Sequence, residues 1–364
     1  MGSDLPPLAR LPLLVMPMIC LLAGVLAGLA RLALDVPEFA AAQAGWHAAL
    51  MVCAFFGAVI SLERAVALGT WWAYLAPASA GAGGLALLAG LPLTLVQAMF
   101  VAASAVLLIG SVKVMQRHLA LFTATLGVGA ACWLLGNLAW IADGAIQAAI
   151  PWWLGFLVIT IAGERLELTR FLPVQAAAGP LFMVAGSVVV MGAATSFWWT
   201  DGGLMVFSAG LFALALWLLR YDIARHNARQ QGLTRYIAVC LLSGYVWLSV
   251  AALIGVMGGF SLSHPWRDAS LHAIALGFVF AMVFGHAPII FPAISRVRIP
   301  YHPAFYLPLV ALHVSLAVRM LGGGSDDNGL RQAGAMLNAL ALVLFIVTMA
   351  ASAVRGRKHR KGRQ

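Results

Sequence analysis

Charged residues are scarce in this chain. Asp, Glu, Lys and Arg together make up 9% of its 364 residues, whereas 63% are hydrophobic and the mean hydropathy is +0.96. So few polar side chains cannot cover the surface of a water-soluble globule. The composition therefore predicts an all-α integral membrane protein, because long apolar segments cross a bilayer as helices.

Cysteine is also rare, and its positions exclude two kinds of site. Cys20, Cys53, Cys132 and Cys240 lie within apolar segments at no metal-finger spacing. We interpret them as small apolar packing residues rather than as disulfide or zinc positions. The N-terminal sequence lacks a charged signal-peptide start and a small-residue cleavage site, so we expect the first apolar segment to be retained.

Apolar segments long enough to span a bilayer recur along the whole chain. A span needs about 20 mainly apolar residues, and this length predicts about twelve helices in one polytopic domain, residues 1–354, followed by a basic tail, residues 355–364. The predicted spans are 11–32, 44–62, 72–92, 93–112, 119–142, 145–163, 174–195, 202–220, 235–257, 269–292, 304–321 and 332–353.

Basic residues are distributed unevenly between alternate loops. With both termini on one side, only four of the 22 Lys and Arg residues fall on the other: Arg31, Arg267, Arg319 and Arg331. Positively charged loops stay in the cytoplasm, so we expect both termini there, in a bacterial inner membrane. The net charge of +10 predicts contact with anionic lipid headgroups rather than with nucleic acid.

Two histidines are predicted at equal depth on different helices. His47 lies about three residues inside the outer end of the second span, and His272 lies about three residues inside that of the tenth, which runs in the same direction. An ionisable residue within a span faces protein, water or a ligand. This placement suits a b-type haem held by two axial nitrogens. The alternative is two unrelated interfacial histidines, each bonded to a backbone carbonyl.

Two further histidines lie deeper in the predicted bundle. In a continuous α-helix, the 14 residues from His272 to His286 place both on one face, about 40° and about 21 Å apart. His313, in the next span, is expected at a depth similar to that of His286. The pair could hold a second metal or relay protons, with Met282 as a soft ligand. The alternative for either histidine is a hydrogen bond to a carbonyl.

Three other residues are predicted to contact the cofactor. Tyr245 and Trp247 lie in the middle of the ninth span, where a hydroxyl and an indole nitrogen need partners. Arg267 lies in the outer loop before the tenth span, at the level expected for haem propionates. Arginine pairs bidentately with such carboxylates.

Three patches resemble the NnrS family of multi-span haem and copper membrane proteins. GWHAALMVCAFFGAVI is similar to that family's Trp-His helix, SGYVWLSVAALIGV to its Gly-Tyr-x-Trp helix, and LHAIALGFVFAMVFGHAPI to a later His-Ala helix. The order agrees, and the family in turn resembles the catalytic subunit of haem-copper oxidases. The resemblance implies a similar helical bundle, haem ligation by His47 and His272, and copper as a second cofactor.

The resemblance also implies a role in nitric oxide and nitrosative-stress responses, or in denitrification-associated electron transfer, with a nitrogen-oxide or redox partner. Any enzymatic activity would be that of an oxidoreductase acting on nitrogen oxides. Two axial histidines leave no open iron position, which favours electron transfer or sensing. The chain lacks the adjacent His pair that holds copper in oxidases, and Leu241, Leu242 and Ser243 stand where the family's Tyr-Trp helix usually carries a histidine.

Two other functions stay open from the sequence. A proton-coupled secondary transporter would use His286, His313, Glu63 and Glu164. A copper or haem assembly factor would use Met16, Met18 and Cys20 as transient soft ligands. The apolar spans look alike for all three functions, so the occupancy of a few histidines is what distinguishes them.

Overall fold

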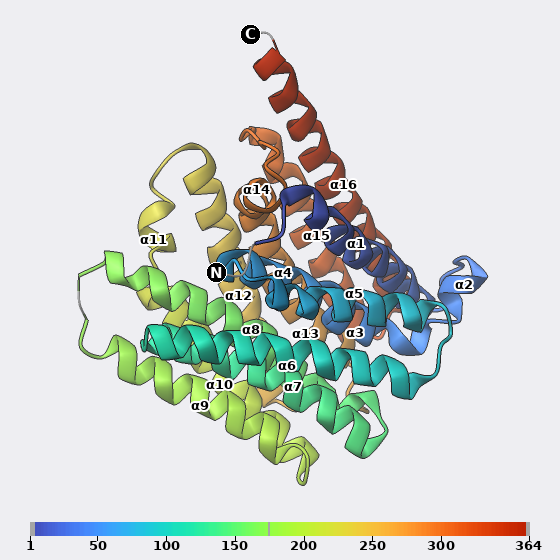
Figure 1. Cartoon of the computed structure of the whole chain (residues 1–364). Coiled ribbons are helices and arrows are strands. Elements are labelled where there is room, and N and C mark those ends of the chain that lie inside the picture. Colours follow the sequence, from blue (N-terminus) through green and yellow to red (C-terminus); the bar gives the residue numbers. More distant parts are fainter. Residues whose placement is uncertain (1–3, 174, 362–364) are drawn as a thin grey trace. The chain divides into compact units, whose positions relative to one another are not determined.

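Helices account for all the regular structure in the described part of the chain (Figure 1). The computed structural model describes residues 4–173 and 175–361, and these ranges contain no β-strand. Eleven helical stretches within them are long and apolar enough to cross a membrane. The prediction of an all-α, multi-pass membrane protein is therefore confirmed.

The chain folds as two compact units, Met1–Glu164 and Arg165–Gln364, and the boundary falls within one helix. The first unit contains α1 (Pro7–Ala30), α2 (Glu38–Ala41), α3 (His47–Ala49), the π-helix η2 (Leu50–Phe56), α4 (Gly57–Leu68), α5 (Leu75–Leu88), α6 (Leu93–Arg117), α7 (Leu121–Asp143) and most of α8 (Ile150–Leu168). The second contains α9 (Ala178–Thr195), α10 (Thr200–Tyr221), α11 (Ala224–Asn227), α12 (Gly232–Val256), α13 (Arg267–His272), the π-helix η6 (Ala273–Phe280), α14 (Ala281–Ser295), α15 (Tyr306–Gly324) and α16 (Asn328–Lys361). Composition does not reveal this division, because no polar linker interrupts the apolar pattern there.

Several observed helix ends differ from the predicted ones by a few residues, and one predicted span is too short to cross a bilayer. The segment predicted to span over 72–92 forms a 3-10 turn at Trp71–Tyr74 and then α5, whose 14 residues extend about 21 Å. This is shorter than the ~30 Å hydrocarbon core of a bilayer, because the chain turns at Gly90, where φ is 70°. At the other end of the chain, α16 continues as one helix through the predicted start of the tail at residue 355.

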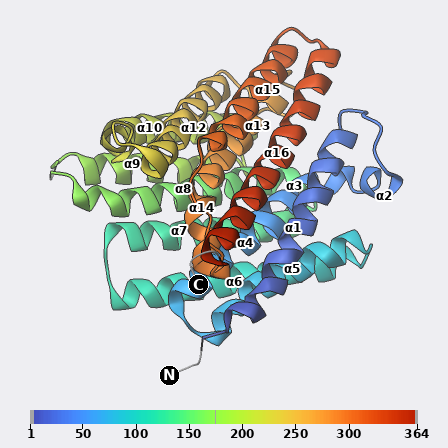
Figure 2. The same ribbon diagram turned by 90° about the horizontal axis from the view of Figure 1, so that it is seen from above.

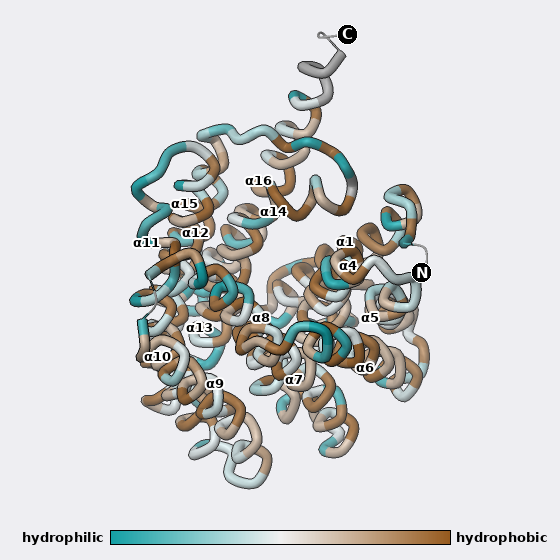
Figure 3. The backbone as a smooth tube through the Cα atoms, turned by 60° about the vertical axis from the view of Figure 1, so that its left-hand side comes forward, coloured by the Kyte–Doolittle hydropathy of each residue, from teal (hydrophilic) through white to brown (hydrophobic). Residues whose placement is uncertain are grey.

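Many large apolar side chains are exposed on the helices, in addition to those buried in the core. The hydrophilic connections between helices stand out in Figure 3. Val184 on α9, Val310 on α15 and Val347 on α16 are 62%, 57% and 56% exposed. An exposed apolar surface of this kind suits hydrocarbon and not water. The arrangement supports the membrane assignment independently of helix length.

Asn137 on α7 ties together the core of the first unit. Its amide nitrogen donates to the Phe100 carbonyl at 3.0 Å and to Ser104 Oγ at 3.1 Å, both on α6. Its amide oxygen accepts from Trp153 Nε1 on α8 at 3.0 Å and from the Cys53 thiol of η2 at 3.3 Å. The side chain is buried, so it joins four helical segments where lipid offers no other partner. Cys53, like the other three cysteines, is a buried free thiol.

In the second unit, a buried ion pair and a closely packed helix pair hold the helical segments together. Arg165 Nε donates to Asp222 Oδ2 at 2.7 Å and Nη2 donates to Oδ1 at 3.1 Å, which joins the ends of α8 and α10. Helices α15 and α16 lie side by side (Figure 2). Gly334 permits this approach, because a Cβ there would fall 2.6 Å from the Arg319 Cα.

Replacing Asn137 with Ala is expected to lower the stability of the first unit. The substitution leaves the Trp153 indole N–H and the Cys53 thiol without their acceptor, and each unpaired buried group costs roughly 1–3 kcal/mol. Circular dichroism in detergent should show N137A unfolding at a clearly lower temperature than the wild type. Gln147→Ala, which removes an exposed amide from the same unit, is the control. Equal unfolding temperatures for the two variants would contradict the role given to Asn137.

Candidate functional site

Two spans contain a π-helical stretch shortly after a predicted haem ligand. The π-helix η2 follows His47 within one turn in the span Ala44–Leu68. The π-helix η6 follows His272 directly in the span Arg267–Ile294. π-helices are rare and frequently mark functional sites. The structure therefore distinguishes the same two spans that the sequence selected by histidine depth.

The π-helix η6 also changes the relation between His272 and His286. The expected angle of about 40° assumed a continuous α-helix. Eight of the intervening residues instead form i→i+5 hydrogen bonds, which turn the chain less per residue than the α-helical pattern does. The expected angle is therefore wrong for this pair.

His47 lies against α1, within the first unit. Its Nδ1 is 2.7 Å from the Gly24 carbonyl oxygen. The ring also rests on Gly28, because a Cβ at that position would lie 2.7 Å from His47 Cε1 and 2.9 Å from Nδ1. When Nδ1–H donates to the carbonyl, the neutral ring carries its lone pair on Nε2. Metal-binding histidines commonly use this arrangement.

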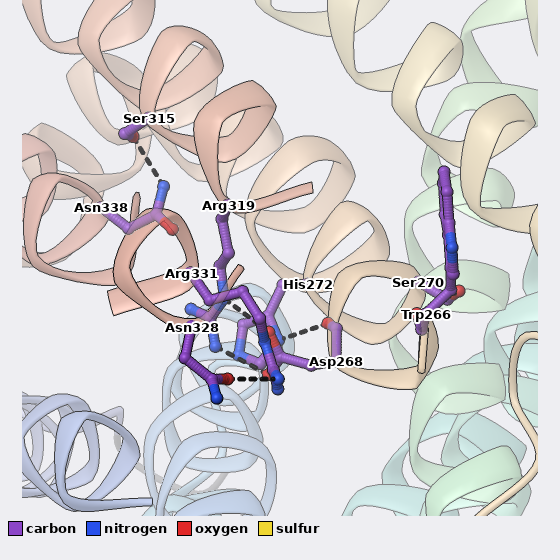
Figure 4. A network of polar contacts seen from close by, with 9 residues as sticks. All are labelled: Trp266, Asp268, Ser270, His272, Ser315, Arg319, Asn328, Arg331 and Asn338. Atoms are coloured by element: carbon purple, nitrogen blue, oxygen red, sulfur yellow. Dashed lines mark hydrogen bonds and ion pairs between the residues drawn. The ribbon is translucent and has the colours of Figure 1, made fainter. Parts of the chain in front are cut away.

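His272 uses the same nitrogen, but a charged group lies beside it (Figure 4). Its Nδ1 is 2.8 Å from the Asp268 carbonyl oxygen and 3.3 Å from Asp268 Oδ1. Arg319 of α15 donates Nε to Oδ2 and Nη2 to Oδ1 of the same carboxylate, each at 2.8 Å. Arg319 is 6% exposed. It is one of the four arginines that the sequence placed on the side opposite the termini, and its side chain is buried within the second unit.

Arg267 and Arg331, two other arginines of that set, hold local structure. Arg267 Nη1 donates to the Phe260 carbonyl at 2.5 Å. Arg331 Nη1 donates to Asn328 Oδ1 at 3.0 Å, in the first turn of α16. The pairing of Arg267 with a haem propionate stays a prediction.

Trp247 and His313 were predicted for different sites, and the structure joins them. Trp247 Nε1 donates to His313 Nδ1 at 2.9 Å, so the neutral ring carries its proton on Nε2, 2.9 Å from Ser243 Oγ. Ser243 donates onward to the Val239 carbonyl at 2.8 Å. Both nitrogens of His313 are thus engaged, and a metal ion at His313 would have to displace one of these bonds.

His286 is half-buried and Tyr245 is buried within the second unit. His286 Nδ1 is 2.8 Å from the Met282 backbone carbonyl, which is the carbonyl alternative considered from the sequence. Tyr245 is fully buried, without a well-formed hydrogen bond to its hydroxyl. Its ring centroid is 6.3 Å from that of Phe278 in η6. Among the described residues, no group of three or more His, Cys, Asp and Glu side chains could hold a metal ion.

The residues of the alternative functions make structural contacts in the first unit. Arg64 of α4 pairs with Glu164 of α8 at 2.5 Å. A cavity of about 190 Å³ lies beside Arg64, lined mainly by small apolar side chains of α4, α6 and α7. Met16 and Cys20 pack against Gly81 and Gly84 of α5. Proton coupling and soft-metal transfer stay predictions.

Together these features define a multi-pass α-helical membrane protein whose few polar side chains are concentrated in specific hydrogen-bonded clusters. The profile of a family described as a domain of unknown function, DUF8744, matches residues 10–354, so the chain belongs to that family. No curated protein matches the chain. The family description names no cofactor or activity, and the resemblance to NnrS therefore stays a prediction.

Replacing Trp247 with Phe is expected to destabilise the second unit by roughly 1 kcal/mol, the net value of one hydrogen bond. The substitution keeps an aromatic ring but removes the donor to His313 Nδ1. Thermal unfolding in detergent should therefore begin at a lower temperature. Trp198→Phe, at an 81% exposed position, is the matched control and should unfold like the wild type. Indistinguishable unfolding of the two variants would argue against a net stabilising bond.

Proposed function

We propose that this chain is a haem-binding protein of the bacterial inner membrane, similar to NnrS, acting in electron transfer or nitric oxide sensing. One observation carries the proposal. His47 and His272 each precede a π-helix within an apolar span. Each also places Nδ1 against a backbone carbonyl, a contact that two unrelated interfacial histidines would make as well. This tautomer presents the Nε2 lone pair, which is the donor that an axial ligand of haem iron requires.

Buried aromatic side chains follow both histidines along their spans. The π-helix η2 carries Phe55 and Phe56, each 4% exposed, and η6 carries Phe278 and Phe280, 0% and 3% exposed. Sites for organic cofactors are lined mainly by apolar and aromatic side chains with a few fixed polar groups. These aromatic residues within about two turns of each histidine would supply the apolar part of such a site, and the imidazoles would supply the donors.

The chemistry that follows is electron transfer rather than turnover. A b-type haem, when bound, supplies a one-electron iron couple. His47 and His272 would hold the group through their imidazole nitrogens, and ligation by two histidines would favour electron transfer or sensing over turnover. Gly24 and Gly28 fix the orientation of His47 from α1.

Removing either imidazole tests the proposal directly. His47→Ala and His272→Ala should each abolish haem retention, measured on the detergent-purified protein by its visible spectrum and a pyridine haemochrome assay. The control is His226→Ala, at an exposed position in α11. One haem per chain, lost in both variants, would assign both histidines to a single iron. Full haem content in both variants, or a colourless wild type after expression with ample haem, would refute the proposal.

A second test moves His47 without removing it. Gly28→Ala introduces a methyl group against the His47 ring and should displace it from the Gly24 carbonyl. We expect a severalfold loss of haem content, although Ala favours an α-helix more than Gly does. Gly45→Ala is the matched control, because a Cβ there meets nothing within 4 Å. Equal haem content in the two variants would contradict the placement of His47.

A further inference from the structure

We propose that Asp268 and Arg319 are positioning residues that set the donor strength of His272, and thereby the reduction potential of the iron it would bind. This inference rests on the proposed function. It assigns a role to two residues that make no direct contact with iron, and it predicts shifts of opposite sign when the two are substituted.

The geometry places one carboxylate oxygen between a cation and the imidazole. Asp268 Oδ1 accepts from Arg319 Nη2 at 2.8 Å and lies 3.3 Å from His272 Nδ1 (Figure 4). Asp268 lies one turn before His272 in α13, and Arg319 reaches it from α15. The carboxylate is therefore fixed from outside its own helix and cannot turn away from the imidazole without losing a bidentate bond.

Burial strengthens the electrostatic effect of Asp268 and Arg319 on the His272 imidazole. The side chains of Arg319, His272 and Asp268 are 7%, 19% and 24% exposed. Charges in such a setting are screened less than they are at a surface. His47, in contrast, places Nδ1 against the neutral carbonyl of Gly24. Nδ1 of His272 thus has an anionic neighbour, whereas the hydrogen-bond partner of Nδ1 in His47 carries no charge.

The direction of each effect follows from electrostatics. A carboxylate behind a ligating imidazole raises its basicity and favours ferric iron, which lowers the reduction potential. The Arg319 guanidinium offsets part of that negative charge. Removing the charge of Asp268 should therefore raise the potential, and removing the charge of Arg319 should lower it. A general loosening of the site would not produce two opposite shifts.

The experiment is redox potentiometry of the full-length, haem-loaded protein in detergent. Asp268→Asn keeps the backbone carbonyl that accepts from His272, so haem should be retained. Its potential should rise by about 59 mV, a tenfold change in the ratio of oxidised to reduced haem for a one-electron couple. Arg319→Gln should shift the potential in the opposite direction. Asp268→Glu should restore a value near the wild type, and Asp143→Asn, at an exposed position in the first unit, should leave it unchanged.

Each outcome supports or overturns the inference. Opposite shifts for Asp268→Asn and Arg319→Gln support it, whereas shifts of the same sign, or an Asp268→Asn potential equal to that of Asp143→Asn, overturn it. If Arg319→Gln does not retain haem, the comparison of Asp268→Asn with Asp268→Glu decides. A purely steric role predicts a wild-type potential for the isosteric Asp268→Asn and a shifted potential for the longer Asp268→Glu, which is the reverse of the expected result. A wild-type protein without haem overturns the proposed function, and this inference with it.

Discussion

Lipid offers no hydrogen-bond partner, and this constraint decides how the few polar side chains of the chain are arranged. Asn137 contacts three other helical segments, Asp222 closes a buried ion pair between α8 and α10, and Asp268 binds an arginine from a different helix. Each unit thus has its own polar cluster. Because a broken cluster cannot be repaired by solvent, these contacts fix the register of helices whose apolar faces alone would allow sliding.

Hydropathy predicted the positions of most spans because composition determines whether a segment enters a bilayer. Hydropathy did not predict that α5 is too short to cross the hydrocarbon core of a bilayer, because the length of this helix depends on the turn at Gly90. The π-helices were also missed, because i→i+5 and i→i+4 hydrogen bonds use the same residue types. The chain's own residue pattern therefore defined the class of protein well and the local helix geometry poorly.

The candidate site shows a similar division. Depth along the spans selected His47 and His272, but the partner of each imidazole could not be read from the sequence. Asp268 lies four residues before His272, a spacing that could have revealed it, whereas Arg319 was placed with the outer-side residues because charge counting ignores burial. The bond between Trp247 and His313 joins two spans, and no local pattern reports such a pair.

The π-helix η2 separates two α-helical parts of one span. Residues before and after it therefore do not follow the angular spacing of a continuous α-helix. His47 precedes it and α4 follows it. Insertion or deletion of a single apolar residue within η2 would rotate His47 by about 100° relative to α4, while hydropathy and span length would hardly change. A homologous sequence could therefore keep every predicted span and its histidine, yet aim that histidine at a different neighbour.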